Sequence, residues 1–156
     1  MTNPMSEPNP DAGTETITLR MPSRLELLGV LDRVADVLCE RLDFDEDARS
    51  QVTMSVIEAG TNAIQHGHHR DASKPVDVEF HVLPDILEIV VHDTGPGFDI
   101  SKVNGNVTSP DHLMDARGRG IFIMRSCMDE VGWTFTGTGT VCRLVKKRPP
   151  PQADAS

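Results

Sequence analysis

Polar side chains and glycines gather in three short segments of the chain. In the first, Glu58, Asn62 and His66 are spaced four residues apart, so on a helix they lie on one face. Such a stripe is most often a solvated helix face. Gly60 lies within it, and a glycine in mid-helix costs about 1 kcal/mol relative to alanine. That glycine is more easily tolerated where another group packs close to the backbone.

The second segment is DTGPGF at residues 93–98, directly after an apolar, alternating run. It places the Asp93 carboxylate at the end of a predicted strand. Gly95 and Gly97 would let a flat ligand approach the backbone, because glycine has no Cβ. Taken alone, the segment is equally consistent with a plain turn that ends a strand.

The third segment lies at the predicted start of a helix and contains Arg117, Gly118, Arg119, Gly120 and Ile121. The first N–H groups of a helix lack intrahelical partners and bind anions. The two arginines add positive charge in an otherwise acidic chain. The alternative is a glycine hinge that only ends the preceding loop.

Other signatures of cofactor binding are missing from the sequence. No G-x-x-x-x-G-K-[ST] motif occurs, so a P-loop is excluded. The three cysteines form no C-x-x-C pair, which argues against a thiolate zinc site or a redox motif. His66, His68 and His69 end a predicted helix and have no acidic or cysteine partner at ligand spacing. A metal site at these histidines is therefore disfavoured.

Length and composition restrict the class of protein. The chain has 156 residues, of which 38% are hydrophobic and 25% charged, and a net charge of -9. We expect one domain over residues 15–147 between tails at 1–14 and 148–156. The negative charge argues against direct nucleic-acid binding and against a basic membrane-surface helix. With no signal peptide and no apolar run of about 20 residues, we expect a cytoplasmic protein.

The remaining patterns predict the elements that position these segments. Alternating and apolar runs predict strands at 14–21, 76–83, 86–92, 131–136 and 140–146. Helical spacing predicts helices at 25–42, from Asp43 or Asp45 to His66, and at 120–129. A capping box at Ser23 and Glu26 would begin the first helix, and residues 98–117 would form a long binding loop or lid. This order predicts an α+β fold: a two-layer α/β sandwich with a mainly antiparallel sheet and helices on one face.

Together, in this order, the three segments resemble the asparagine box and the two glycine boxes of the GHKL ATPase superfamily. The short form of the chain and its closing strands look most like the bacterial anti-sigma factor serine kinases. The resemblance covers about residues 16–147, and three boxes in order are far more specific than any one. It implies the Bergerat, or histidine-kinase-like, ATPase fold, with ATP and Mg²⁺ as cofactors.

The resemblance also implies a role for each box. Asn62 would hold Mg²⁺ between the phosphates, Glu58 would be the general base, and Asp93 would accept a hydrogen bond from the adenine amino group. The remaining candidates for nucleotide binding are His66, Gly95, Gly97, Arg117, Gly118, Arg119, Gly120, Ile121 and Thr140. Residues 100–116 contain only one cation, Lys102, so a cation that assists transfer would be Lys102 or Arg117.

Two classes of function remain open. The first is a serine/threonine kinase that binds a sigma factor and phosphorylates a STAS-type anti-anti-sigma protein. The second is a nucleotide-dependent clamp that sequesters the sigma factor without phosphoryl transfer. Glu58 favours the kinase, because a clamp has no need of a base beside the magnesium ligand. The family often forms homodimers, and the sequence leaves the oligomeric state open.

Overall fold

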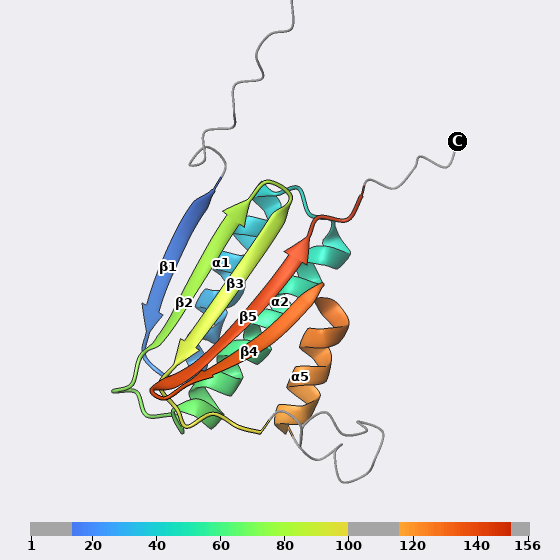
Figure 1. The fold of residues 1–156 in the computed structure, drawn as a ribbon. Coiled ribbons are helices and arrows are strands. Elements are labelled where there is room, and N and C mark those ends of the chain that lie inside the picture. Colours follow the sequence, from blue (N-terminus) through green and yellow to red (C-terminus); the bar gives the residue numbers. More distant parts are fainter. Residues whose placement is uncertain (1–13, 100–115, 151–156) are drawn as a thin grey trace, which may run out of the picture.

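Five antiparallel strands form one sheet in the order β1-β2-β3-β5-β4 (Figure 1). The computed structural model describes residues 14–99 and 116–150. Each neighbouring pair of strands is antiparallel, and the strands are β1 (Glu15–Met21), β2 (Val76–Leu83), β3 (Ile86–Asp93), β4 (Glu130–Thr136) and β5 (Gly139–Lys147). All five predicted strands are present. Most of the predicted tails and of the predicted 98–117 loop lie outside the described residues.

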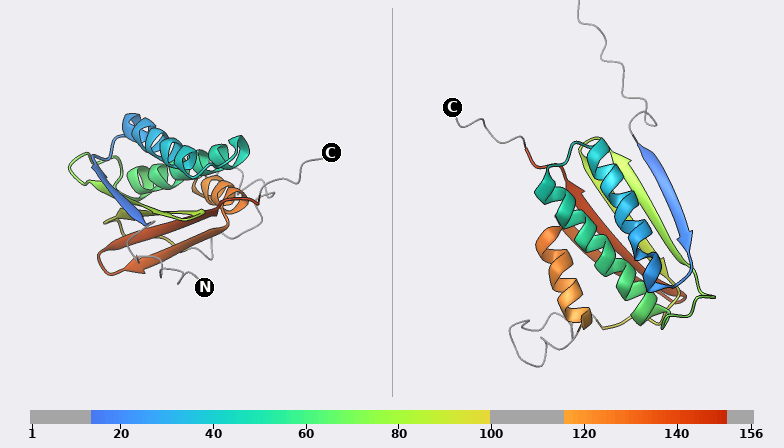
Figure 2. Two further views of the ribbon diagram at one scale, coloured as in Figure 1. Left: turned by 90° about the horizontal axis from the view of Figure 1, so that it is seen from above. Right: turned by 180° about the vertical axis from the view of Figure 1, so that it is seen from behind.

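Three helices cover one face of the sheet, as the views from above and behind show (Figure 2). They are α1 (Leu28–Arg41), α2 (Glu46–Thr61) and α5 (Ala116–Cys127). The core between the layers is mainly aliphatic, and its largest fully buried side chains include those of Phe80, Leu31, Ile89, Leu144 and Met124. The predicted two-layer sandwich is confirmed. No helix in the described ranges has the length and apolarity needed to cross a bilayer.

The predicted start of the second helix is confirmed, whereas the predicted start of the first helix is not. Asp45 begins α2 as expected, because its side chain accepts a hydrogen bond from the Ala48 N–H at 2.8 Å. The capping box predicted at Ser23 is wrong. The chain enters α1 through a 3₁₀ turn, η1 (Leu25–Leu27), and the buried Ser23 hydroxyl instead donates to the Lys74 carbonyl oxygen at 2.6 Å.

The second helix is not regular up to His66. It is α-helical to Thr61 and continues as a π-helix, η2 (Asn62–Gly67). The His68 N–H, for example, donates to the Ala63 carbonyl at 2.9 Å, a bond that spans five residues. Single π turns of this kind are frequent at functional sites. Here the wide turn carries Asn62 and brings Gly67 against the end of β3, as described below.

Helix α5 begins four residues earlier than predicted, at Ala116, so Arg117 lies in its first turn. The glycines of this turn are poor helix formers and add no apolar side chains, so the apolar pattern did not predict this turn as helical. At the opposite end, the buried Lys146 ammonium donates to the Cys127 carbonyl and to the Gln51 side-chain oxygen, both at 2.6 Å. Strand β5 therefore holds the C-terminus of α5.

Candidate nucleotide-binding site

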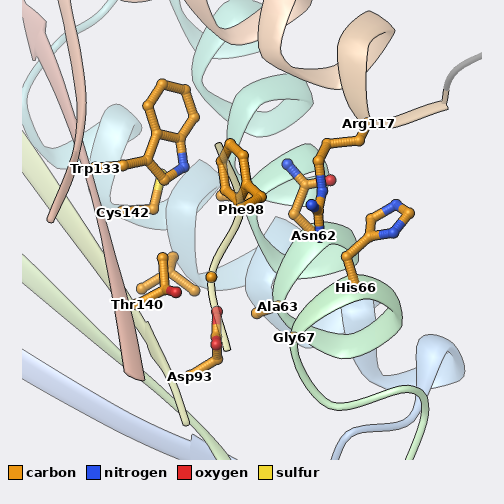
Figure 3. Close-up of a pocket in the computed structure, with 13 residues that line it drawn as sticks. Asn62, Ala63, His66, Gly67, Asp93, Phe98, Arg117, Trp133, Thr140 and Cys142 are labelled. Atoms are coloured by element: carbon orange, nitrogen blue, oxygen red, sulfur yellow. The ribbon is translucent and has the colours of Figure 1, made fainter. Parts of the chain in front are cut away.

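One pocket opens between the end of α2, the π-helix, the end of β3, the start of α5 and the β4–β5 hairpin (Figure 3). It brings together six residues that the sequence predicted as site residues. These are Asn62, His66, Asp93, Gly97, Arg117 and Thr140. The other lining residues are Ala59, Ala63, Gly67, Val91, Phe98, Trp133 and Cys142. Segments far apart in the sequence thus converge on one pocket.

The Asp93 carboxylate lies at one end of this pocket, where β3 ends. Its Oδ1 accepts a hydrogen bond from the Gly95 N–H at 2.8 Å. Burial raises the pKa of Asp93 above its usual value, opposed by the Gly95 hydrogen bond, by the charge of His68 in its protonated form and by the charge of Arg117. An acceptor that is partly desolvated and aimed into a pocket suits a ligand that carries an N–H donor.

Glycines allow the backbone to close tightly around Asp93. A Cβ built on Gly67 would lie 2.7 Å from the Asp93 Cγ, and one built on Gly95 would collide with the Gly67 backbone. Gly97 has a φ of 79°, in the left-handed region that favours glycine. At both positions a Cβ would collide with other parts of the protein, so Gly95 and Gly97 allow close packing of the chain around Asp93, and the predicted approach of a ligand to them stays a prediction. The contribution of Gly67 was missed, although its position after a helical pattern was a usable signal.

Aromatic rings line the pocket beside Asp93. The Phe98 ring packs edge-on against Trp133, with centroids 6.0 Å apart, and against Phe135, at 5.2 Å. The Arg117 guanidinium lies 4.4 Å from the Phe98 centroid, within cation–π distance. Sequence reasoning did not assign Phe98 or Trp133. Phe98 directly follows the glycine motif, so the sequence could have indicated its place in the site. Trp133 lies far along the chain on β4, and only the fold brings it to the pocket.

Buried polar atoms from two sides of the pocket, the Asn62 Nδ2 and the Thr140 Oγ1, have no hydrogen-bond partner in the described parts of the chain. Thr140 pairs with Asp93 across the β3–β5 ladder, so its hydroxyl belongs to the same end of the pocket. A buried polar group without a partner costs roughly 1–3 kcal/mol. Such groups in a pocket indicate a ligand that supplies the missing hydrogen bonds.

Glu58 lies one helical turn before Asn62, outside the pocket lining and against the first turn of α5. A Cβ built on Gly120 would be 2.6 Å from the Glu58 Oε2, so the glycine makes room for this carboxylate. Burial raises the pKa of Glu58, and the positive charge of Arg119 opposes that rise. A carboxylate whose pKa is raised toward neutrality is suited to general-base chemistry.

The other residues of the third segment are distributed differently. Ile121 is buried in the core, so its side chain is not a nucleotide contact. Arg119 is exposed and acts on Glu58 through its charge, while Gly118 lies in the first turn of α5. Lys102 lies outside the described residues. Of the two predicted cations, Arg117 is therefore the one that the structure places in the pocket.

The candidate metal ligand in this site is the Asn62 side chain. No group of three histidine, cysteine or acidic side chains with metal-binding geometry occurs within residues 14–99 and 116–150. Asn62 has its amide group in the pocket: its side-chain oxygen suits a single protein ligand to Mg²⁺, and its unpartnered Nδ2 is a donor for a phosphate or water oxygen. Magnesium prefers this arrangement, in which water and phosphate oxygens complete the coordination.

Comparison with known proteins agrees with this geometry. The family of histidine kinase-like ATPase domains matches residues 21–146. Curated relatives called serine-protein kinase RsbW include one from Bacillus licheniformis, 34% identical over 120 residues, and one from Bacillus subtilis (strain 168), 30% identical over 120 residues. Each alignment covers 74% of this chain and 75% of the relative.

Solved structures share the fold. The RsbU and RsbW domains of a Mycobacterium tuberculosis protein align with a TM-score of 0.64 at 13% identity, covering 88% of this chain and 33% of that longer chain. A histidine kinase domain from an Erythrobacter litoralis blue-light activated histidine kinase aligns with a TM-score of 0.51 at 21% identity, covering 81% and 61%. The curated relatives named above are called serine-protein kinases, and the chain belongs to the histidine kinase-like ATPase domain family.

Proposed function

We propose that this protein is an ATP-dependent serine/threonine kinase that acts as an anti-sigma factor in the cytoplasm. It binds a sigma factor and phosphorylates a serine on a STAS-type antagonist, and residues 15–147 form its ATP-binding domain. The similarity to serine-protein kinases over three quarters of each relative supports this activity. The sigma factor and the STAS-type antagonist are proposed as partners because the sequence resembles the anti-sigma factor kinases.

The proposal rests mainly on the different chemistry of the two ends of the pocket. Its Asp93 end offers a partly desolvated acceptor beside an unpartnered Thr140 hydroxyl, which suits the amino group and ring edge of adenine. Its opposite end offers the Asn62 amide and the Arg117 guanidinium, which suit a metal and phosphate oxygens. A nucleotide with a base and a phosphate chain matches both ends.

The phosphate end supplies positioning and charge, which are the main requirements of phosphoryl transfer. Mg²⁺ held by Asn62 would neutralise negative charge on the phosphates when it is bound. Arg117 adds a fixed positive charge from the first turn of α5, whose N–H groups favour anions. Asn62, Arg117 and this helix turn together orient the γ-phosphoryl group.

Glu58 completes the reaction as the general base. It takes the proton from the serine hydroxyl as the serine oxygen forms a bond to the γ-phosphorus and the bond to the departing ADP oxygen breaks. Burial raises its pKa, and a carboxylate with a raised pKa is a stronger base. Its position beside Gly120 places it next to the phosphate-binding turn and outside the adenine pocket.

The test separates phosphoryl transfer from nucleotide binding. Purified protein is incubated with radiolabelled ATP and an antagonist shown to bind it, and ATP affinity is measured on the same preparation. We expect Glu58→Gln to keep ATP binding and lose transfer by about 10²–10⁴-fold. Glu46→Gln, at an exposed position in the first turn of the same helix, is the matched control and should keep both activities.

Two results would contradict parts of the proposal. Intact protein that binds ATP and the sigma factor but never labels a bound antagonist would be a sequestering clamp. Labelling that is equal in the Glu58→Gln variant and the intact protein would leave the kinase in place and remove Glu58 as its base.

A further inference from the structure

A chain of buried hydrogen bonds links the start of the helical layer to the loop after Asp93. The Ser23 hydroxyl oxygen lies 2.9 Å from the His68 Nδ1, and the His68 Nε2 accepts from the Thr94 N–H at 2.8 Å. Ser23 and His68 are each only 1% exposed. The nucleotide site as described above does not use either residue.

The geometry fixes the tautomer of the His68 ring. The single proton of the Ser23 hydroxyl is donated to the Lys74 carbonyl oxygen at 2.6 Å. The same hydroxyl oxygen can therefore only accept from His68, so the Nδ1 carries a proton. The Nε2 accepts from the Thr94 backbone N–H, so it carries a lone pair, and the Thr94 Oγ1, 3.0 Å from the same nitrogen, can only be a second donor to it. His68 is thus the neutral Nδ1–H tautomer, with both ring nitrogens satisfied by the protein.

The ring acts on the two backbone segments that enclose Asp93. Thr94 directly follows Asp93, and its N–H has His68 as an acceptor. Gly67 directly precedes His68, and a Cβ there would lie 2.7 Å from the Asp93 Cγ. The next N–H, of Gly95, is held by the Asp93 carboxylate itself. His68 therefore fixes the backbone on which the direction of that carboxylate depends.

We propose that His68 is a positioning residue for base recognition: linked to Ser23, it holds the Thr94 backbone so that Asp93 faces the amino group of adenine. This inference rests on the proposed function, because it takes Asp93 as the acceptor for adenine. On this inference, His68 helps the site to distinguish adenine from guanine. Since both ring nitrogens already have protein partners, His68 has no lone pair available for a metal.

The experiment compares ATP and GTP binding to full-length variants by calorimetry in the presence of Mg²⁺. We expect His68→Leu to weaken ATP binding about tenfold and to reduce the ATP/GTP affinity ratio by a similar factor. His68→Gln should recover most of the ratio, because its side-chain oxygen can accept from the Thr94 N–H. Ser23→Ala, which leaves the ring without its orienting partner, should lower the ratio about threefold.

The neighbouring His69 provides a matched control. It is exposed and has a φ of 50°, which asparagine also tolerates, so His69→Asn should leave both affinities unchanged. Nitrogen-15 spectra of the histidine rings give a readout independent of folding stability. They should show one ring in the Nδ1–H tautomer, and its signal should be absent in the His68 variants.

The outcomes separate this inference from the proposed function. If His68→Leu and Ser23→Ala lower the melting temperature but keep the ATP/GTP ratio of the intact protein, His68 is a structural residue and the inference is overturned. A protonated Nε2 in the spectra would overturn it as well. If Asp93→Asn itself leaves ATP binding intact, the assignment of adenine to Asp93 fails first. Loss of the ratio in His68→Leu, with recovery in His68→Gln, supports the inference.

Discussion

The two ends of the pocket are built in different ways. Around Asp93, backbone meets backbone: a Cβ on Gly95 would strike Gly67, and a Cβ on Gly139 would strike the Asp93 carbonyl. At the phosphate end, the groups in contact are long side chains on helices. A Cβ on Gly120 would meet only the far end of Glu58, which can rotate away.

This difference assigns a different property to each end. Closely packed backbone cannot adjust without a wider shift, so under the proposed function we expect the Asp93 end to be preformed for one base. Flexible charged side chains adjust at low cost, so we expect the phosphate end to follow a group whose charge and position change during transfer. On this proposal, base selectivity depends on the rigid backbone around Asp93, and transfer depends on adjustable side chains.

The largest expected effect comes from the same change, glycine to alanine, made at each end of the pocket. Gly95→Ala forces a Cβ into the Gly67 backbone, and we expect ATP affinity to fall by at least about a hundredfold, some 3 kcal/mol. Gly120→Ala displaces only the Glu58 carboxylate, so ATP affinity should stay within about threefold while phosphoryl transfer falls about tenfold. Calorimetry and labelling of the antagonist measure the two effects.

Gly137→Ala is the control for both variants, because nothing lies within 4 Å of a Cβ at that position. It should change neither ATP affinity nor transfer. Equal losses of ATP affinity in Gly95→Ala and Gly120→Ala would abolish the distinction between a rigid and an adjustable end.

The second prediction concerns the charge at the rigid end. Hydrogen bonds to charged groups contribute about 1.5–3 kcal/mol, so Asp93→Asn should weaken ATP binding roughly ten- to a hundredfold. Intact protein should bind ATP far more tightly than GTP, whose carbonyl at the same position would face the carboxylate. Equal calorimetric affinities for the two nucleotides would be incompatible with the adenine contact of Asp93.

The third prediction concerns the metal at the adjustable end. Asn62→Ala should remove most of the Mg²⁺ dependence of ATP binding, an effect of about tenfold in affinity at saturating metal. His69→Asn should leave that dependence intact, because His69 is exposed and is not among the residues that line the pocket. Titrations of ATP with and without Mg²⁺ measure the effect. Stoichiometric zinc lost on changing the histidines would reverse the assignment.

The smallest expected effect is on stability. The folded protein binds the Asp93 proton more tightly than the unfolded chain, since burial raises this pKa. Ionisation therefore costs stability as pH rises through the folded pKa, and Asp93→Asn should raise the melting temperature at neutral pH by about 2 °C. Below about pH 3, where the carboxyl is protonated in both states, the difference should vanish.

Asp71→Asn is a control of opposite sign. Hydrogen bonds from Ser73 lower the pKa of Asp71, so its ionised form stabilises the fold. This variant should melt below the intact protein at neutral pH, and the difference should again disappear in acid. Melting curves that move in the same direction for both variants would show that burial does not control Asp93.

Local patterns predicted the elements well and the site only in part. Alternating and apolar runs between turn signals located all five strands, and burial alternates cleanly along β2 and β3. The residues that enclose Asp93 depend on long-range packing: Gly67 approaches β3 through a π turn, and Trp133 reaches the pocket from β4. Ser23 shows the same limit, since its local capping pattern was overridden by His68 and Lys74, partners far along the chain.

Because the Lys146 ammonium donates a hydrogen bond to the Cys127 carbonyl, helix α5 is held at its C-terminus and can tilt about that point. Ten residues separate Arg117 from Cys127, so Arg117 lies about 15 Å along the helix from that point. A tilt of about 5° there moves the Arg117 backbone by about 1.3 Å, from the same rise per residue. A displacement of that size decides whether a hydrogen bond to a phosphate forms. A partner that presses on the exposed side of α5, where Phe122 is 53% exposed, would thus be able to tune transfer without entering the pocket.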